Sequence, residues 1–266
     1  MAGLIDLRWT RPRKDMAALS AVDALVRLWK ASGQRPGLET IRTWQEILNG
    51  LPGPVQSALA ALVAGVASAR GEVRSALRGL TPTELSDLAQ AGGLVRETLE
   101  ERQARRIAAA ALKIDRERMA IAMERLLIAT ELARNSLNVE AWSTPPGNVR
   151  SAGADGDLLA AFETPAGPVF LGGPGRTVYR EPAAAILDLG GDDVYEAGAG
   201  AARGPGLPVS ICLDLGGADQ YTAEDDVAQG SGSLGVGLLV DIAGNDWYVS
   251  SNGLCQGCGI TGIGVL

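Results

Sequence analysis

Two different hydrophobic patterns divide the chain. In its first half, apolar residues recur at intervals of three and four in Ala17–Trp29, Leu38–Leu48 and Val55–Leu77, which is the spacing of amphipathic α-helices. A longer stretch, Leu94–Arg134, has the same spacing and predicts one helix of roughly 60 Å. The segment Thr81-Pro-Thr-Glu84 predicts a helix start, with its first threonine as N-cap and its glutamate closing a capping box. The first half is therefore predicted to be helical.

The change of pattern predicts two domains. We assign residues 1–137 to a helical domain, residues 138–155 to a linker with Ser-Thr-Pro-Pro-Gly turn chemistry, and residues 156–266 to a glycine-rich β domain. Two roles are open for the helical domain. It covers the N-terminal end of the β domain, or its long helix binds a protein partner or a second copy of the chain.

The β domain is built from a repeat. Three segments superimpose without gaps, with aspartate at their second and seventh positions and tyrosine at their ninth. They are Leu187–Tyr195, Leu213–Tyr221 and Val240–Tyr248, evenly spaced to within a single position, and a weaker copy precedes them in Val169–Tyr179. A fixed period of this length indicates stacked structural units. No helical spacing lies between the segments, which excludes leucine-rich and ankyrin-like repeats, and the period is too short for propeller blades.

Each repeat unit has the alternation of a β-strand. Leu213 and Leu215 point to one side of the strand and Asp214 to the other. We therefore expect an α+β protein with segregated halves, in which the second half is a right-handed parallel β-helix, or solenoid, of 26–27-residue rungs that turn at glycines. In-register stacking turns each repeat position into a ladder. We expect Leu187, Leu213 and Val240 to form the inward apolar ladder and the tyrosines to form another.

Stacking also brings like charges together. The candidate metal ligands form two acidic ladders, Asp188, Asp214 and Asp241 on one line and Asp193, Asp219 and Asp246 on another. Carboxylates on neighbouring strands repel, so they must protonate, accept backbone hydrogen bonds or share a cation. Hard oxygen ligands at a flexible glycine turn suit Ca²⁺. The alternative is that each aspartate only closes an Asx-type turn by accepting backbone N–H bonds.

The turns resemble those of a known group of proteins. Gly190–Tyr195 (Gly-Gly-Asp-Asp-Val-Tyr) and Ala243–Tyr248 (Ala-Gly-Asn-Asp-Trp-Tyr) resemble the Gly-Gly-x-Gly-x-Asp-x-hydrophobic nonapeptide of RTX-type calcium β-rolls. The whole unit is similar to uncharacterised bacterial proteins with repeated Gly-Gly-Asn-Asp-x-Tyr turns. Two residues of the RTX nonapeptide are missing, and the motif occurs once per rung rather than twice. The resemblance covers the repeats from Leu187 onward and implies that Asp193, Asp219 and Asp246 are calcium ligands.

The composition removes several kinds of chemistry. The 266 residues include no histidine, which excludes Ser-His-Asp catalysis and imidazole zinc sites. A net charge of −7 and a pI of about 4.8 argue against a nucleic-acid partner. The three cysteines do not imply a closed disulfide framework, and small residues, Ala228 and Ser231, hold the positions equivalent to Cys255 and Cys258 one rung earlier. Two Gly-x-Gly-x-x-Gly matches lead into strands, so no nucleotide cofactor is expected.

The start of the chain contains no uninterrupted apolar run. No signal peptide or membrane span is therefore expected, which indicates a cytoplasmic protein on sequence alone, or an extracellular or envelope protein if the chain is a processed fragment.

These patterns favour a non-enzymatic structural or binding repeat protein, stiffened by Ca²⁺ if the acidic ladders hold it. The alternative is a β-helix polysaccharide lyase or hydrolase, which would use paired carboxylates or Ca²⁺, with a glycan as ligand. Against it, the acids obey the repeat, and residues 181–266 contain one basic residue, Arg203. The repeat is interrupted inside a unit at Leu266, so we expect a longer array or an open end that pairs with another chain.

Overall fold

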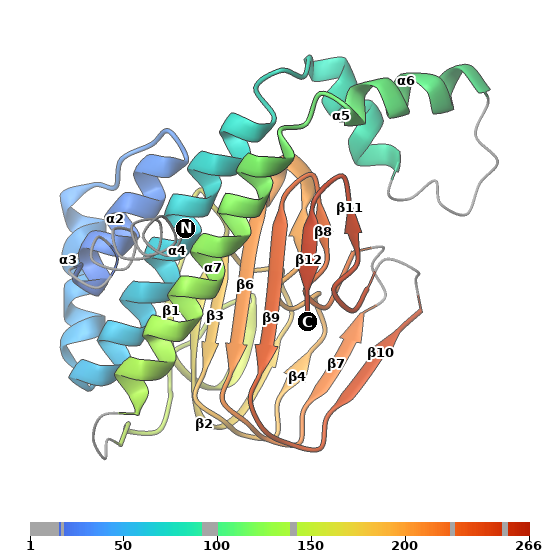
Figure 1. The fold of residues 1–266 in the computed structure, drawn as a ribbon. Coiled ribbons are helices and arrows are strands. Elements are labelled where there is room, and N and C mark those ends of the chain that lie inside the picture. The colour runs from blue at the N-terminus through green and yellow to red at the C-terminus, as the bar shows by residue number, and fades with distance from the viewer. Residues whose placement is uncertain (1–15, 17–18, 92–100, 139–142, 224–226, 252–254) are drawn as a thin grey trace, which may run out of the picture.

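The computed structural model describes residues 16, 19–91, 101–138, 143–223, 227–251 and 255–266. Within these residues, helices α2 to α7 come first and the strands follow (Figure 1). The helices are α2 (Ala21–Ala31), α3 (Leu38–Asn49), α4 (Gly53–Ala76), α5 (Pro82–Ala91), α6 (Glu101–Ala111) and α7 (Arg116–Leu137). The predicted division into a helical part and a strand part is confirmed, with α7 ending at Leu137 and the first strand beginning at Ala154.

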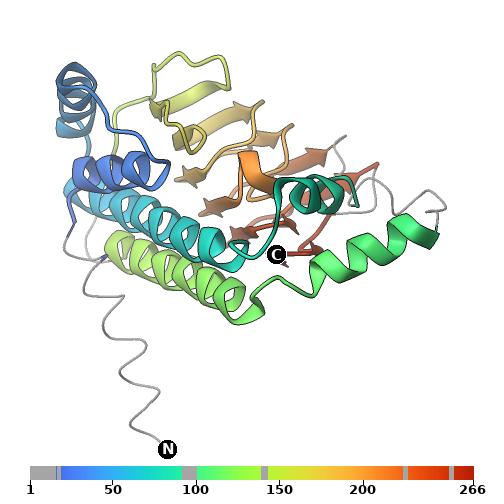
Figure 2. The same ribbon diagram turned by 90° about the horizontal axis from the view of Figure 1, so that it is seen from above.

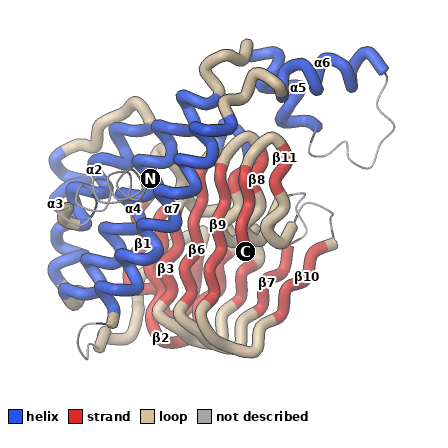
Figure 3. Tube along the Cα trace, in the orientation of Figure 1, coloured by secondary structure: helices blue, strands red, loops and turns tan. Residues whose placement is uncertain are grey.

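The strands are mostly short and parallel. They are β1 (Ala154–Phe162), β2 (Val169–Tyr179), β3 (Ala185–Asp188), β4 (Val194–Tyr195), β5 (Ala202–Arg203), β6 (Val209–Asp214), β7 (Gln220–Ala223), β8 (Gly232–Ser233), β9 (Val236–Asp241), β10 (Trp247–Ser250), β11 (Gly259–Ile260) and β12 (Ile263–Val265). A short 3-10 turn, Gly204–Gly206, precedes β6. The larger sheet runs in the order β10-β7-β4-β2-β3-β6-β9-β12, and β5, β8 and β11 form a second, smaller sheet. The larger sheet curls into a half-barrel (Figure 3).

The repeat positions lie side by side in adjacent parallel strands, as the period predicts. Leu213 pairs with Leu187 and with Val240. Tyr221 pairs with Tyr195 and with Tyr248. We call β3-β4-β5, β6-β7-β8 and β9-β10-β11 the first, second and third rungs. The long strand β2 precedes them and pairs with both β3 and β4, so it holds together two faces of the coil.

The turns need glycine, as the sequence predicts. Gly190, Gly191 and Gly216 have φ values of 123°, 125° and 139°, a region that L side chains rarely adopt. At Gly217 the constraint is contact rather than φ, because a Cβ there would overlap the carbonyl oxygen of Gly191 on the neighbouring rung. Side chains at these points would push the rungs apart.

Two helices form a layer over the sheet. α4 and α7 pack against each other and against β3, β6 and β9, as the view from above shows (Figure 2). They cover a face of the sheet, whereas the sequence predicts that the helices cover the N-terminal end of the strand stack. That end is formed by β1, which pairs antiparallel with β2, and helix α3 contacts β1 there, with Trp44 edge-on to Phe162.

The predicted helix from Leu94 to Arg134 is not continuous. Its first residues, up to Glu100, lie outside the described residues, and the remainder forms α6 and α7 with a break between them. Asp115 begins α7, where its carboxylate accepts the N–H of Arg118 (3.0 Å) and its own N–H donates to the Ala76 carbonyl (3.1 Å). The apolar spacing is helical on both sides of the break, so periodicity alone does not reveal it. The capping box at Thr81 and Glu84 is confirmed by reciprocal hydrogen bonds.

The close approach of α4 and α7 depends on Gly65. A Cβ at this position would overlap the Ala129 side chain and lie 3.2 Å from the Arg125 carbonyl oxygen of α7. Gly71, on the same helix, has open space around it. Gly65→Ala is therefore expected to destabilise the protein by about 2 kcal/mol through overpacking. Gly71→Ala is expected to stabilise it by about 0.5–1 kcal/mol, because alanine is the better helix former. Urea unfolding of the two variants checks the opposite signs, and two shifts of the same sign would contradict the packing described here.

Candidate metal centre

The acidic ladders point into the coil. Asp188, Asp193 and Asp214 have no exposed surface, and Asp219 is 1% exposed. The leucine side of the same strands faces the helices, where Leu187 and Leu213 join the core formed with α4 and α7. The expectation that Leu187, Leu213 and Val240 line the interior of the coil is therefore wrong. Strand alternation shows which residues share one side of a strand, but it does not show which side faces the interior of the coil. Here both sides are buried, one against the helices and one inside the coil.

The interior is shared by the acids and the tyrosines. Tyr179, Tyr195, Tyr221 and Tyr248 stack with ring centroids 4.8, 4.5 and 4.5 Å apart and with nearly parallel planes. Ile186, Cys212 and Leu239 lie on the same side of their strands as the aspartates and complete an apolar cluster around the rings. The ladder of tyrosines is confirmed as a stack of aromatic rings.

The first acidic ladder accepts the tyrosine hydroxyls. Tyr179 donates to Asp188 (2.5 Å), and Tyr195 and Tyr221 both donate to Oδ2 of Asp214 (2.6 and 3.1 Å). In the third rung, Tyr248 donates to Asp241 (2.6 Å). The stacking of the rings was expected from the sequence, but this role of their hydroxyls was not. A signal for it exists, because a tyrosine follows the first aspartate of every repeat at the same spacing.

Backbone N–H groups also bind the acids, in two ways. Asp188 and Asp214 each accept the N–H two residues ahead, from Gly190 and Gly216 (both 2.8 Å), which is the Asx turn. The second ladder instead joins rungs. Asp219 accepts the N–H of Asp193 (2.7 Å), Asp246 accepts that of Asp219 (3.0 Å), and Asp193 accepts that of Thr177 (2.5 Å).

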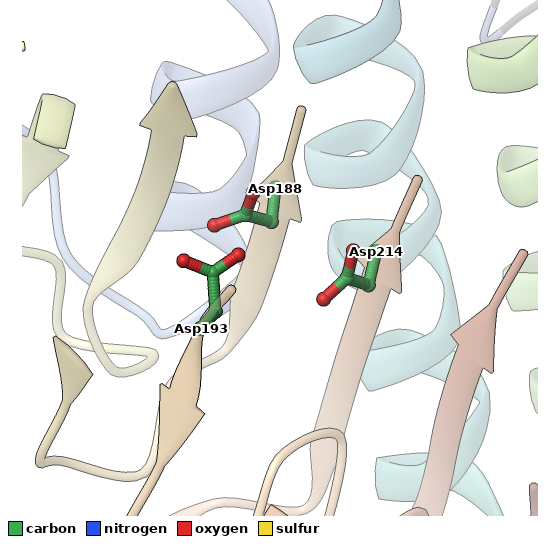
Figure 4. Close-up of side chains that lie close together, drawn as sticks. All are labelled: Asp188, Asp193 and Asp214. Atoms are coloured by element: carbon green, nitrogen blue, oxygen red, sulfur yellow. The ribbon is translucent and has the colours of Figure 1, made fainter. Parts of the chain in front are cut away.

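The two ladders converge into two groups of three carboxylates. Asp188, Asp193 and Asp214 each place one oxygen within 4.8 Å of the others, and so do Asp214, Asp219 and Asp241. We call these groups the first and second triads. Asp188 and Asp214 lie at the ends of β3 and β6, and Asp193 lies just before β4, so that the three carboxylates of the first triad gather between these strands (Figure 4). Each triad takes two acids from one rung and one from the next, and Asp214 belongs to both. Of the six predicted ligands, Asp246 lies outside the triads.

The hydrogen bonds to the triads leave some of their carboxylate oxygens without a partner. Oδ2 of Asp193 and Oδ2 of Asp219 are buried without a hydrogen-bond partner. The salt bridges formed among the described residues lie elsewhere, on the helices and at Arg180. An unpaired buried carboxylate oxygen is costly, so each triad needs a proton or a cation.

Burial is the main reason that the pKa values of these acids rise. Desolvation raises the pKa of Asp193 to about 7 and that of Asp219 to about 8, and the Asp214 carboxylate adds to both shifts. The pKa of Asp188 rises well above its usual range, first through burial and then through Asp193 and Asp214. Burial also raises the pKa of Asp241. Near neutral pH, the triads therefore hold protons when no cation is present.

Comparisons of the chain with protein-family models, with curated proteins and with solved structures found no match. The fold and the site themselves define the class of protein: a parallel half-barrel backed by a helical layer, with an interior of stacked tyrosines and carboxylate triads. Among the described helices, none has the length and apolar character needed to cross a bilayer.

Proposed function

We propose that this protein is a non-enzymatic structural and binding repeat protein, a right-handed β-solenoid whose rungs are held together by Ca²⁺ in the two triads. It would belong with the bacterial Gly-Gly-Asn-Asp-x-Tyr repeat proteins that its turns resemble. The observation that carries the proposal is the pair of buried, unpartnered oxygens, Oδ2 of Asp193 and Oδ2 of Asp219, each within a group of three convergent carboxylates.

The donor set favours calcium among the common metals. The triads offer only oxygen, which suits hard cations, whereas Zn²⁺ prefers the nitrogen and sulfur of histidine and cysteine. Mg²⁺ demands near-ideal octahedral geometry and gives up its water reluctantly. Ca²⁺ accepts irregular sets of six to eight oxygens at about 2.3–2.6 Å, and carboxylates, backbone carbonyls and water together can supply such a set.

A cation in a triad would act as a cross-link. The first triad joins Asp188 and Asp193 of the first rung to Asp214 of the second, and the second triad repeats this arrangement one rung later. Binding would therefore resist separation of neighbouring rungs. The burial of Asp188, Asp193, Asp214 and Asp219 supports a structural role over glycan hydrolysis, because a sugar chain cannot reach carboxylates that have almost no exposed surface.

Calcium is expected to raise the melting temperature. A ligand that binds only the folded state stabilises it by mass action, by about 2.7 kcal/mol at a hundredfold excess over Kd. Asp219→Asn should remove about half of this gain, because it takes one of the three carboxylates from the second triad, leaves the first triad intact and keeps an oxygen that can accept the Asp193 N–H. The matched control is Asp192→Asn, an exposed neighbour that removes the same charge outside the triads.

Differential scanning calorimetry in EDTA and in millimolar CaCl₂ measures the shift, and isothermal titration calorimetry should give two sites per chain. A wild-type melting temperature that does not change with calcium would contradict the proposal. Equal calcium shifts in the two variants would also contradict it, because they would place the cation elsewhere.

A further inference from the structure

Strand β2 carries neutral residues at the places where the later rungs carry acids. The register of its pairing with β3 places Gly172 opposite Asp188. The register of its pairing with β4 places Thr177 opposite Asp193. The glycine follows from space, because a Cβ at this position would overlap the carboxylate of Asp188 and the hydroxyl of Tyr179. The threonine needs a different explanation.

Thr177 continues the second acidic ladder into β2. Its N–H donates to Oδ1 of Asp193 (2.5 Å), as the Asp193 N–H donates to Oδ1 of Asp219 one rung later (2.7 Å). Its side chain lies on the same side of β2 as Tyr179, which stacks on Tyr195 inside the coil. Thr177 has no exposed surface. The hydroxyl therefore lies inside the coil, at the ladder position where the next rungs place a carboxylate.

The hydroxyl oxygen of Thr177 is buried without a hydrogen-bond partner. The same is true of Oδ2 of Asp193 and Oδ2 of Asp219, so three successive members of the ladder each keep one unpaired oxygen. By contrast, the buried hydroxyl of Thr130 donates to the Leu126 carbonyl (3.0 Å). A buried polar group without a partner is costly, so this line of unpaired oxygens points to a ligand that binds them.

We infer that Thr177 supplies a fourth side-chain oxygen to the cation of the first triad. The inference rests on the proposed function, because it requires a cation among Asp188, Asp193 and Asp214. Ca²⁺ takes roughly six to eight oxygens, so three carboxylates leave room for further ligands. A hydroxyl suits this place, because its lone pairs bind a cation without adding a fourth negative charge to carboxylates that already repel one another.

The fourth ligand extends the cross-link to a further strand. The three carboxylates belong to the first and second rungs, whereas Thr177 belongs to β2, which precedes both. One cation would then join three successive turns of the coil. Because the hydroxyl has no partner of its own, removing it should be harmful only when calcium is bound.

Thr177→Val tests this role, because valine keeps the branched shape and removes the oxygen. In EDTA the variant should melt about 2–4 °C higher than its parent, since it no longer buries an unpaired hydroxyl. In CaCl₂ its affinity at the first triad should be at least about tenfold weaker, and its calcium-dependent gain in melting temperature smaller by about 4 °C. Scanning and titration calorimetry at pH 8 measure both effects. The parent is Asp219→Asn, so that the intact first triad dominates the titration.

Two controls separate the oxygen from the shape of the side chain. Thr177→Ser keeps the oxygen and should keep the calcium affinity of the parent. Thr130→Val is the matched control, since it removes a buried hydroxyl that is already paired, far along the chain in α7. It should lower the melting temperature in EDTA and leave the calcium-dependent gain unchanged.

The outcomes separate this inference from the function beneath it. If Thr177→Val gains as much from calcium as its parent, the hydroxyl is not a ligand, and the triads stand without it. A loss of affinity that is equal in Thr177→Ser would also overturn the inference, because the shape of the side chain and not its oxygen would then be the cause. A wild-type protein that does not respond to calcium would overturn the proposed function together with the inference.

Discussion

Replacing Asp214 with alanine is expected to lower the free energy of unfolding by about 4 kcal/mol, or the melting temperature by about 10 °C. The side chain is fully buried and accepts three hydrogen bonds, from Tyr195, Tyr221 and the N–H of Gly216. Alanine leaves all three donors without an acceptor in the interior and opens a cavity among them. The relief of repulsion from the neighbouring carboxylates offsets only part of this loss, because protons already neutralise part of the triads.

Two further variants separate the causes. Asp214→Asn keeps an oxygen for the donors and should lose less stability than the alanine variant. Asp192→Ala removes one charge and the acceptor of the Ala218 N–H from an exposed position in the preceding rung, and should lose about 1 kcal/mol. Urea unfolding followed by circular dichroism measures all three. If Asp214→Ala unfolds at the same urea concentration as Asp192→Ala, the buried hydrogen-bond network does not hold the coil together.

The second large effect is a fall in stability with rising pH when calcium is absent. Asp193 and Asp219 have folded pKa values of about 7 and about 8, against an ordinary value of 3.8. At a pH between the ordinary pKa of 3.8 and these folded pKa values, the folded protein holds protons that the unfolded chain has released. Raising the pH through this range therefore favours unfolding. The stability that protonated Asp193 and Asp219 contribute is fully present below the unfolded pKa and is lost as the pH rises through their folded pKa values of about 7 and about 8. From pH 5.5 to pH 9 in EDTA, we expect the melting temperature to fall by roughly 10 °C.

Calcium should reverse this dependence. The cation binds the deprotonated carboxylates, so its stabilising effect should be larger at pH 8 than at pH 5.5, and binding at neutral pH should release protons. Asp219→Asn should flatten the pH dependence in EDTA, because it removes one of the two groups that titrate in this range. The measurement is a series of melts across pH with and without CaCl₂. A melting temperature that stays constant or rises from pH 5.5 to pH 9 in EDTA would show that the triads are not protonated in the folded state.

The helical half illustrates what local patterns convey. The capping box at Thr81 was predictable because its residues interact within one turn of helix. The break before α7 was not, because it depends on the bond from the Asp115 N–H to the Ala76 carbonyl at the end of α4, which is distant in the sequence. The same holds for Gly65, whose role follows from the position of α7 and not from its neighbours in α4.

By itself, the sequence determined the stacking register of the second half. The even spacing of the repeats places Leu213 beside Val240 and Tyr221 beside Tyr248, and the glycine pattern marks the turns. Register follows from sequence because equivalent positions in successive rungs must pair, whatever surrounds them. The two acidic ladders were visible for the same reason.

Only the tertiary structure decided which side of each strand is inside the coil. Alternation separates Leu213 from Asp214, but the layer of α4 and α7 buries the leucine side and leaves the aspartates to the interior with the tyrosines. The convergence of the two ladders into triads also depends on how each turn folds back, which brings Asp188 and Asp193 of one rung to Asp214 of the next. Strand periodicity is a property of the local backbone, whereas burial depends on what the rest of the chain places against each face.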